Sequence, residues 1–166
     1  ANSTYELMRK KAETCIEKFV KENGKQFSEV EYVEKYFEVA FRKDILVNGR
    51  IDLIRRKNIE GKWEVIIVDY KTGERKPSEL EQRLQLEIYA LGYKKLTGQD
   101  ADVLEIVDIE GNEVVSSRAV LPDNLEDTAE RIRDACDEIL DNNNVKRVCE
   151  KNKCKNCNHR LMCYSL

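Results

Sequence analysis

Long apolar segments are missing from this chain of 166 residues. The longest aliphatic run, Val65 to Val68, lies between charged neighbours, whereas a membrane-spanning helix needs roughly 18 or more apolar residues in succession. The chain does not open with a secretory signal peptide either. We therefore expect a cytoplasmic protein without a membrane partner.

Residues that mark linkers are also scarce, with two prolines and seven glycines. The chain has no linker rich in Pro, Gly or Ser, no internal repeat and no low-complexity tract, and its length fits one domain. We predict a core domain over 1–144 and a Cys-rich tail of the same domain over 145–166. Because the chain starts at Ala1 without a methionine, we expect it to be processed or cut from a longer polypeptide.

An excess of positive charge is absent as well. The chain has 29 Lys and Arg against 32 Asp and Glu, a net charge of −3, which excludes a globally basic coat for nucleic acid. Residues 145–166 differ, because they hold six Lys and Arg against the single acid Glu150. Phosphate contacts are therefore expected in an active cleft and along this basic tail.

The apolar periodicity predicts an α/β domain with a mixed central sheet flanked by helices. Capping boxes at Ser3/Glu6 and Ser78/Glu81 start two helices, and a period of two begins at Phe37. We expect a close turn at Asn48-Gly49, a polar loop over 55–62 and a hairpin about Gly111-Asn112. The predicted helices lie near 4–22, 78–97 and 123–141, and the strands near 37–42, 45–54, 63–71, 101–109 and 113–120.

Charged residues end an otherwise aliphatic strand. Side chains two apart on a strand share a face, so Asp69 and Lys71 point together. Asp52 on the neighbouring strand could join Asp69 in supplying hard oxygen ligands for Mg²⁺ or Mn²⁺, and Lys71 could stabilise charge on a phosphate. A plain ion pair at the strand end is the alternative.

Two further polar residues, Gln85 and Tyr89, are spaced i, i+4 on the next helix and so share a face. The ordered set resembles the RecB-like branch of the PD-(D/E)XK nuclease superfamily, whose pattern is G-x-x-D, then D/E-x-K followed by T-G, then Q-x-x-x-Y. The matching segments are Gly49 to Asp52, Asp69 to Gly73 and Gln85 to Tyr89. Glu38 looks like the acidic residue that precedes G-x-x-D in this branch.

The resemblance implies a restriction-endonuclease-like core and a Mg²⁺- or Mn²⁺-dependent deoxyribonuclease. It implies exonuclease-type hydrolysis of single-stranded or unwound DNA ends, within a helicase-nuclease or a DNA repair or recombination protein, with a helicase domain or subunit as partner. The metal would be held by Asp52, Asp69 and the Tyr70 backbone carbonyl. The implied catalytic residues are Asp52, Asp69, Lys71, Gln85, Tyr89 and Glu38.

One feature of the branch is missing. Its members usually carry a metal-binding histidine on a helix upstream of the first strand, and the only histidine here is His159. The chain resembles the later part of a nuclease module appended to UvrD/RecB-type helicases, with its first helices outside. A catalytically inactive DNA-binding or scaffolding module is therefore a second hypothesis, and a zinc-binding interaction domain is a third.

The last feature is the cysteine spacing. Cys154, Cys157 and Cys163 form C-x2-C-x5-C, which indicates metal or cluster ligation in a chain without a secretory signal. The family resemblance implies a structural [4Fe-4S] cluster, with a fourth cysteine from upstream; the spacing also allows Zn²⁺. Cys149 or Cys15 could be the fourth ligand, whereas Cys136 and Cys15 also fit as buried free thiols on apolar helix faces.

Overall fold

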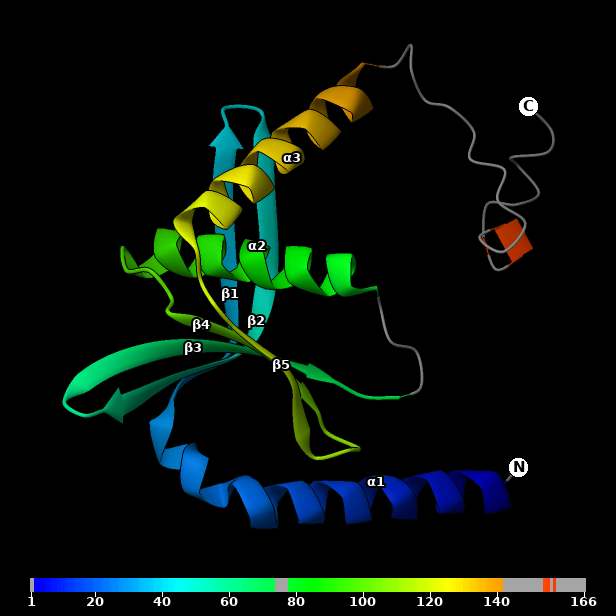
Figure 1. The fold of residues 1–166 in the computed structure, drawn as a ribbon. Coiled ribbons are helices and arrows are strands. Elements are labelled where there is room, and N and C mark those ends of the chain that lie inside the picture. Colours follow the sequence, from blue (N-terminus) through cyan, green and yellow to red (C-terminus); the bar gives the residue numbers. More distant parts are fainter. Residues whose placement is uncertain (1, 74–77, 142–153, 156, 158–166) are drawn as a thin grey trace.

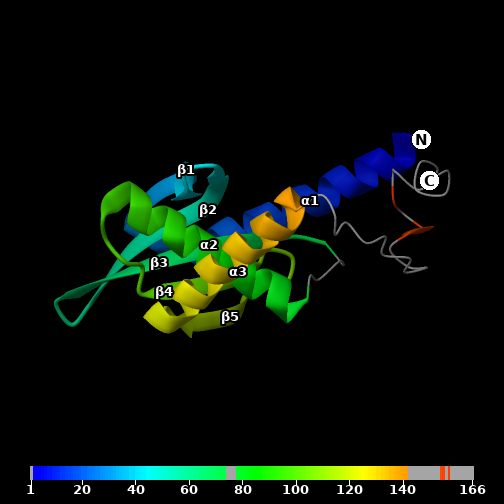
Figure 2. The same ribbon diagram turned by 90° about the horizontal axis from the view of Figure 1, so that it is seen from above.

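The computed structural model describes residues 2–73, 78–141, 154–155 and 157. Within these residues the chain forms a five-stranded sheet with helices on both faces (Figures 1 and 2). The helices are α1 (Asn2–Asn23), η1 (a 3-10 helix, Gly24–Glu29), α2 (Glu79–Thr97) and α3 (Pro122–Leu140). The strands are β1 (Val30–Arg42), β2 (Ile45–Ile59), β3 (Lys62–Lys71), β4 (Val103–Asp108) and β5 (Glu113–Ala119). The predicted α/β class, a mixed central sheet flanked by helices, is confirmed.

The strands lie in the order β1-β2-β3-β4-β5. All neighbouring pairs are antiparallel except β3 and β4, which are parallel and are joined through α2. A parallel pair needs such a crossover, and its helix covers one face of the sheet. Figure 1 shows α2 and α3 above β3, β4 and β5, with β1 and β2 rising behind α2, and α1 below the sheet. No helix among the described residues is long and apolar enough to cross a membrane.

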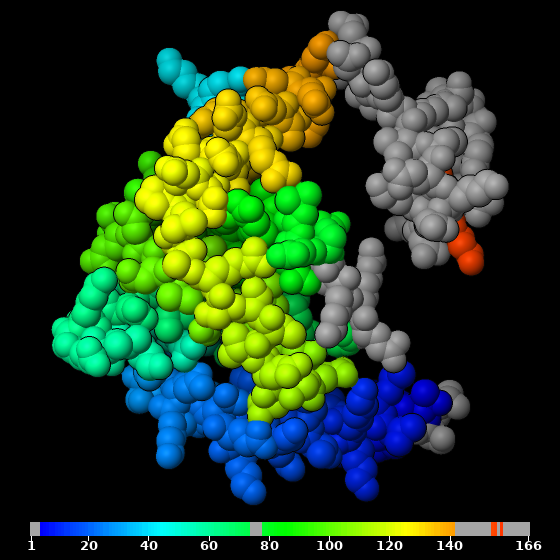
Figure 3. Space-filling view, viewed as in Figure 1, coloured from blue at the N-terminus to red at the C-terminus, as the bar shows by residue number. Residues whose placement is uncertain are grey.

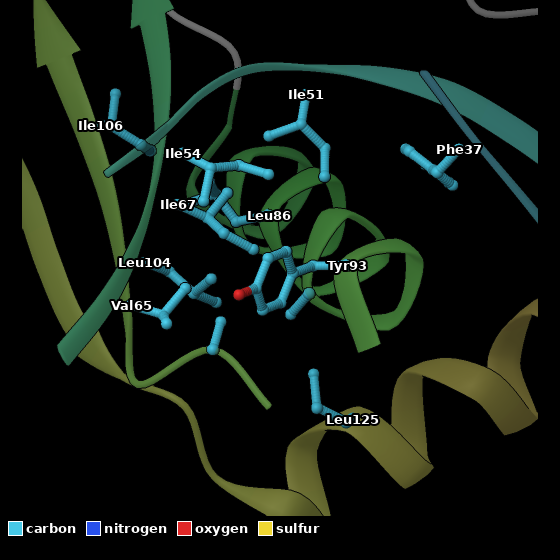
Figure 4. Packing of buried hydrophobic residues seen from close by; sticks show 12 residues of the cluster. Phe37, Ile51, Ile54, Val65, Ile67, Leu86, Tyr93, Leu104, Ile106 and Leu125 are labelled. Carbon is cyan, nitrogen blue, oxygen red and sulfur yellow. The ribbon is translucent and has the colours of Figure 1, made fainter. Parts of the chain in front are cut away.

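The main core lies between the sheet and α2 (Figure 4). At its far side the ring of Phe37, 1% exposed, packs where Gly49 and Gly92 carry no side chain. A Cβ built on Gly92 would lie 2.5 Å from Phe37 Cγ, and one on Gly49 would lie 2.8 Å from Phe37 Cζ. Both glycines therefore let α2 approach the sheet closely over Phe37. The buried core is Phe37, Ile51, Ile54, Val65, Ile67, Leu86, Ala90, Tyr93, Ala101, Leu104, Ile106 and Leu125.

Two strands, β1 and β2, are longer than the alternation of the sequence predicts. β1 begins at Val30, and the expected loop over 55–62 is wrong, because β2 runs to Ile59 and turns into β3 at Glu60-Gly61. The expected turn at Asn48-Gly49 is also wrong, since Gly49 pairs with Phe37 inside one continuous strand. Cross-strand pairing overrides the weak strand propensity of these polar segments.

Helix boundaries agree better with the sequence. Ser78 caps α2 in the predicted capping box with Glu81, and Gly98 ends this helix in the left-handed region at φ 73°. The first box is wrong, because α1 begins at Asn2 and so includes Ser3. The predicted boundary of the core at residue 144 lies outside the described residues, as does most of the tail.

Candidate active site

The two acidic residues Asp52 and Asp69, called the acidic pair below, lie where the β2–β3 ladder ends. Leu53 and Val68 form the last registered pair, so Asp52 and Asp69 are the next residues on their strands. Beyond the ladder, the Tyr70 backbone N–H donates to Asp52 Oδ2 at 2.9 Å. This bond holds the Asp52 carboxylate against β3, beside Asp69, and the negative charge of Asp52 adds to the raised pKa of Asp69. Asp52 and Asp69 are therefore neighbours at the end of this ladder, and their convergence on one cation stays a prediction.

Asp69 is a buried carboxylate, with only 2% of the residue exposed. Burial is the largest cause that raises the pKa of Asp69 above its ordinary value, and the neighbouring Lys71 opposes it. Lys71 Nζ lies 2.7 Å from Asp69 Oδ2, but among the described residues this oxygen has no hydrogen bond of good geometry. The Lys71 ammonium is therefore the partner that offsets the burial of this carboxylate.

A hydrogen-bonded chain leads from Lys71 onto α2. Lys71 Nζ donates to Gln85 Oε1 at 2.8 Å, and Gln85 Nε2 donates to the Tyr89 hydroxyl oxygen at 2.9 Å. The Tyr89 ring meets Phe37 edge-on, with centroids 6.0 Å apart. Burial raises the pKa of Tyr89, and the charges of Asp52 and Asp69 raise it further. The structure therefore brings Gln85 and Tyr89 to the acidic pair, as the sequence predicts.

Glu38 does not join this cluster. It pairs with Asn48 on β2, four residues from Asp52 and hence about 13 Å along the strand. Its carboxylate accepts a hydrogen bond from the Tyr36 hydroxyl at 3.2 Å. The expectation that Glu38 lines the same cleft does not fit this register.

Glu34, and not Glu38, is the acid of β1 that lies opposite Asp52, and its carboxylate is 3.6 Å from Arg50 Nη1. The flanking pairs Val33–Leu53 and Lys35–Ile51 put Glu34 opposite Asp52, and the Glu34 charge also raises the pKa of Tyr89. Glu34 has a left-handed φ of 50° inside β1, which is a strained backbone for a residue other than glycine. Sequence alternation alone could not find it, because this irregularity changes which residues share a face.

The donor set fits a hard divalent cation. Among the described residues no group of three or more His, Cys, Asp and Glu is placed to hold a metal ion. Mg²⁺ does not require one, because it commonly binds through one or two carboxylates and keeps several waters. Asp52 and Asp69 supply two carboxylates, and Asp69 Oδ2 already lies 2.7 Å from the Lys71 ammonium, so this position suits positive charge.

Comparison with known families decides the identity of the fold. The family model described as PD-(D/E)XK nuclease superfamily matches residues 2–164. The chain belongs to the PD-(D/E)XK nuclease superfamily. At the end of β3 the segment Asp69-Tyr70-Lys71 places a buried acid beside a lysine, with Lys71 Nζ 2.7 Å from Asp69 Oδ2.

A solved structure shares the superfamily fold. It is a protein of Eubacterium rectale that carries the provisional name exonuclease, and it superposes with a TM-score of 0.56 at 15% sequence identity. The match covers 92% of this chain and 59% of that protein. A search of the curated proteins found no match. This PD-(D/E)XK domain thus spans a little over half of the neighbour's length.

The described cysteines do not form a metal site in this domain. Cys15 on α1 donates its thiol to the Ile109 carbonyl at 3.3 Å, and Cys136 is half-buried on α3. Cys154 and Cys157 are joined by a backbone hydrogen bond from Cys157 N–H to the Cys154 carbonyl. Cys149, Cys163 and His159 lie outside the described residues, so the ligand set of the tail stays a prediction.

Proposed function

We propose that this chain is a metal-dependent deoxyribonuclease domain of the RecB-like branch. It hydrolyses phosphodiester bonds at single-stranded or unwound DNA ends, as an exonuclease within a longer helicase-nuclease or repair protein. The observation that carries the proposal is the close placement of Asp52, Asp69 and Lys71 where the β2–β3 ladder ends. The family match supports the nuclease chemistry.

The proposed metal ligands are the two carboxylates of Asp52 and Asp69 and the backbone carbonyl of Tyr70. A divalent cation held there would supply a Lewis acid that polarises the phosphodiester and lowers the pKa of a water molecule. Asp52 is already held in place by the Tyr70 N–H, which reduces the ordering needed before a ligand binds. Glu34, opposite Asp52 in the register, adds negative charge that favours a cation in this cleft.

Lys71 is the proposed group that stabilises negative charge on the phosphate during cleavage. Its ammonium is fixed between Asp69 and Gln85, so it needs little rearrangement to face a bound phosphodiester. Gln85 positions Lys71, and Tyr89 in turn positions Gln85 through its hydroxyl. Gln85 and Tyr89 therefore act through the lysine.

Cleavage of end-labelled DNA tests this function. With Mn²⁺ or Mg²⁺ the chain should degrade single-stranded DNA faster than blunt duplex DNA. The products should be short and should be released from a DNA end. Addition of EDTA should stop the reaction, and excess Mn²⁺ should restore it. A folded chain that binds DNA but never cleaves it with either metal would instead be the non-catalytic module.

The Cys-rich tail supports two further parts of the proposal, a metal or iron-sulfur cluster and an intracellular location. The C-x2-C-x5-C spacing and the turn between Cys154 and Cys157 suit a [4Fe-4S] cluster, with Zn²⁺ as the alternative and a fourth cysteine from Cys149, Cys15 or outside the chain. Thiolate ligands also suit a reducing intracellular compartment. Iron and zinc analysis of anaerobically purified protein, with serine in turn at Cys154, Cys157 and Cys163, decides between the metals; unchanged metal content in all three variants would exclude a tail site.

The helicase partner is supported by the sequence resemblance to the RecB-like branch. The test is to express the complete parent polypeptide and measure DNA-stimulated ATP hydrolysis. A parent protein without an ATPase domain, and without an ATPase that copurifies with it, would contradict this part alone.

A further inference from the structure

An open groove lies between α1 and the turn that follows β4. Its volume is about 430 Å³. It is lined by three lysines, Lys10, Lys11 and Lys18, together with Thr14 and the single acid Glu110. Figures 1 and 2 show that α1 continues past the sheet, and Figure 3 shows it beneath the β4–β5 hairpin. Because the three lysines are exposed, a large ligand can reach this groove.

Two hydrogen bonds connect the groove to the end of β3. The Cys15 thiol, which also lines the groove, donates to the Ile109 carbonyl at 3.3 Å. The Ile109 backbone N–H donates in turn to the Lys71 carbonyl at 3.0 Å. The Lys71 side chain bonds to Gln85 on α2. The groove and the proposed nuclease site therefore lie on opposite sides of the same edge of the sheet.

The groove has an excess of positive charge on an otherwise acidic chain. Three lysines against one glutamate leave two positive charges in excess, whereas the net charge of the chain is −3. Lys11 Nζ lies 3.4 Å from a Glu110 oxygen, and 73% of the Lys11 side chain is exposed. Such an exposed pair contributes little in water. Lys10 and Lys18 make no ion pair with another described residue, so both ammonium groups are available to an anion.

The spacing of these lysines suits a strand of phosphates. Lys11 and Lys18 are seven residues apart on α1, so the helix separates them by about 10 Å along its axis. Successive phosphates of a B-form strand rise by only about 3.4 Å. The two lysines can therefore contact separate phosphates of one strand, and Lys10 widens the same positive strip.

We propose that this α1 groove holds the phosphate backbone of single-stranded DNA whose end lies in the proposed nuclease site, through Lys10, Lys11 and Lys18. The choice of DNA rests on the proposed nuclease function. The test measures DNA binding without cleavage, so failure of the groove and failure of the nuclease function give different results.

The binding test uses the fluorescence anisotropy of a labelled oligothymidine, with EDTA present to prevent cleavage. The double variant Lys10→Ala/Lys18→Ala removes the two lysines that have no ion pair among the described residues. Alanine has the highest helix propensity, so this α1 variant should stay folded. The control Lys57→Ala/Lys62→Ala removes the same charge from exposed positions at the other end of β3, where Lys62 lies about 30 Å along the strand from Lys71.

The salt dependence of binding distinguishes the two variants. Each phosphate that a lysine neutralises on a single strand contributes roughly 0.7 to the slope of log affinity against log salt concentration. The α1 variant should therefore show a slope smaller by about 1.4 than that of the parent, and the control should keep the parent slope. An unchanged slope in the α1 variant, an equal change in both variants, or a parent that does not bind the oligothymidine would overturn the proposal.

Cleavage kinetics with Mn²⁺ test the link between the groove and the proposed nuclease site. The α1 variant should show a KM for oligothymidine raised about tenfold or more with little change in kcat, because these lysines hold the strand away from the cleaved bond. A fall in kcat at unchanged KM would overturn this role. A parent that binds DNA through the groove but cleaves none would contradict the proposed function and leave the groove assignment in place.

Discussion

At the scale of single residues, Asp69 combines deep burial with a charge that the metal-free fold disfavours. Because the pKa of Asp69 is raised on folding, the folded state holds the proton more strongly than the unfolded chain. Its stabilising contribution is therefore complete below the unfolded pKa, about pH 4, and is lost as pH rises through the folded pKa. With EDTA present, Asp69→Asn should unfold at a higher temperature than the parent at pH 7.

The same comparison near pH 4 is the control, since both carboxyl and amide are then mostly neutral. The difference in unfolding temperature should shrink there. An Asp69→Asn variant that is less stable than the parent at pH 7 in EDTA would show that the Lys71 pair outweighs the cost of burial.

Lys71 and Tyr89 should differ in the size of their kinetic effects. Lys71→Met removes the charge proposed to face the phosphate, so kcat should fall by roughly 10² to 10³. Tyr89→Phe removes only the hydroxyl that accepts from Gln85, a net loss of about 1 kcal/mol and hence roughly fivefold. Steady-state cleavage kinetics with Mn²⁺ would measure both, and a Tyr89→Phe effect as large as that of Lys71→Met would contradict positioning through Gln85.

Glu34 and Glu38 form a matched pair of acids on β1. Calorimetric titration with Mn²⁺ should show weaker binding for Glu34→Gln, by a fewfold, because the variant loses a negative charge opposite Asp52. Glu38→Gln should bind Mn²⁺ like the parent, since its register partner is Asn48. Weaker Mn²⁺ binding by Glu38→Gln, with unchanged binding by Glu34→Gln, would instead support Glu38, the acid that the sequence pattern favours.

At the scale of elements, the placement of α2 over the sheet depends on Phe37 and two glycines. Gly92→Ala should destabilise the protein by about 1–3 kcal/mol, because the added Cβ meets the Phe37 ring. Gly24→Ala, which would meet nothing within 4 Å, is the control. Urea unfolding would measure both. When Phe37 is already replaced by leucine, Gly92→Ala should lower the free energy of unfolding by less than it does in the parent. An equal loss in the parent and in Phe37→Leu would show that positions 37 and 92 do not interact.

The elements also show what the sequence could and could not predict. The capping box at Ser78 and the glycine at position 98 gave the bounds of α2 correctly, because both act through local backbone chemistry. The D-x-K strand and the i, i+4 spacing on α2 likewise brought together Lys71, Gln85 and Tyr89. Glu34 and the uninterrupted path of β2 through Asn48-Gly49 were missed, because they depend on the register between strands.

At the scale of the whole molecule, the two faces of the sheet differ. The α2 face holds Asp69 and Lys71, while the α1 face holds an apolar cavity of about 380 Å³ whose lining includes Arg55. Tyr70 belongs to both, because its backbone holds Asp52 and its ring lines the cavity. The proposed nuclease site therefore lies on a strand that is packed from both sides.

The central claim is that Asp52 and Asp69 hold the metal for DNA cleavage. The most direct measurement compares Mn²⁺-dependent cleavage of single-stranded DNA by the parent, Asp52→Asn, Asp69→Asn and Asp123→Asn, an exposed acid in the first turn of α3. Circular dichroism would show that each variant is folded. We predict that the parent and Asp123→Asn cleave at similar rates and that the other two variants do not cleave. Retained cleavage by folded Asp52→Asn or Asp69→Asn would contradict the account.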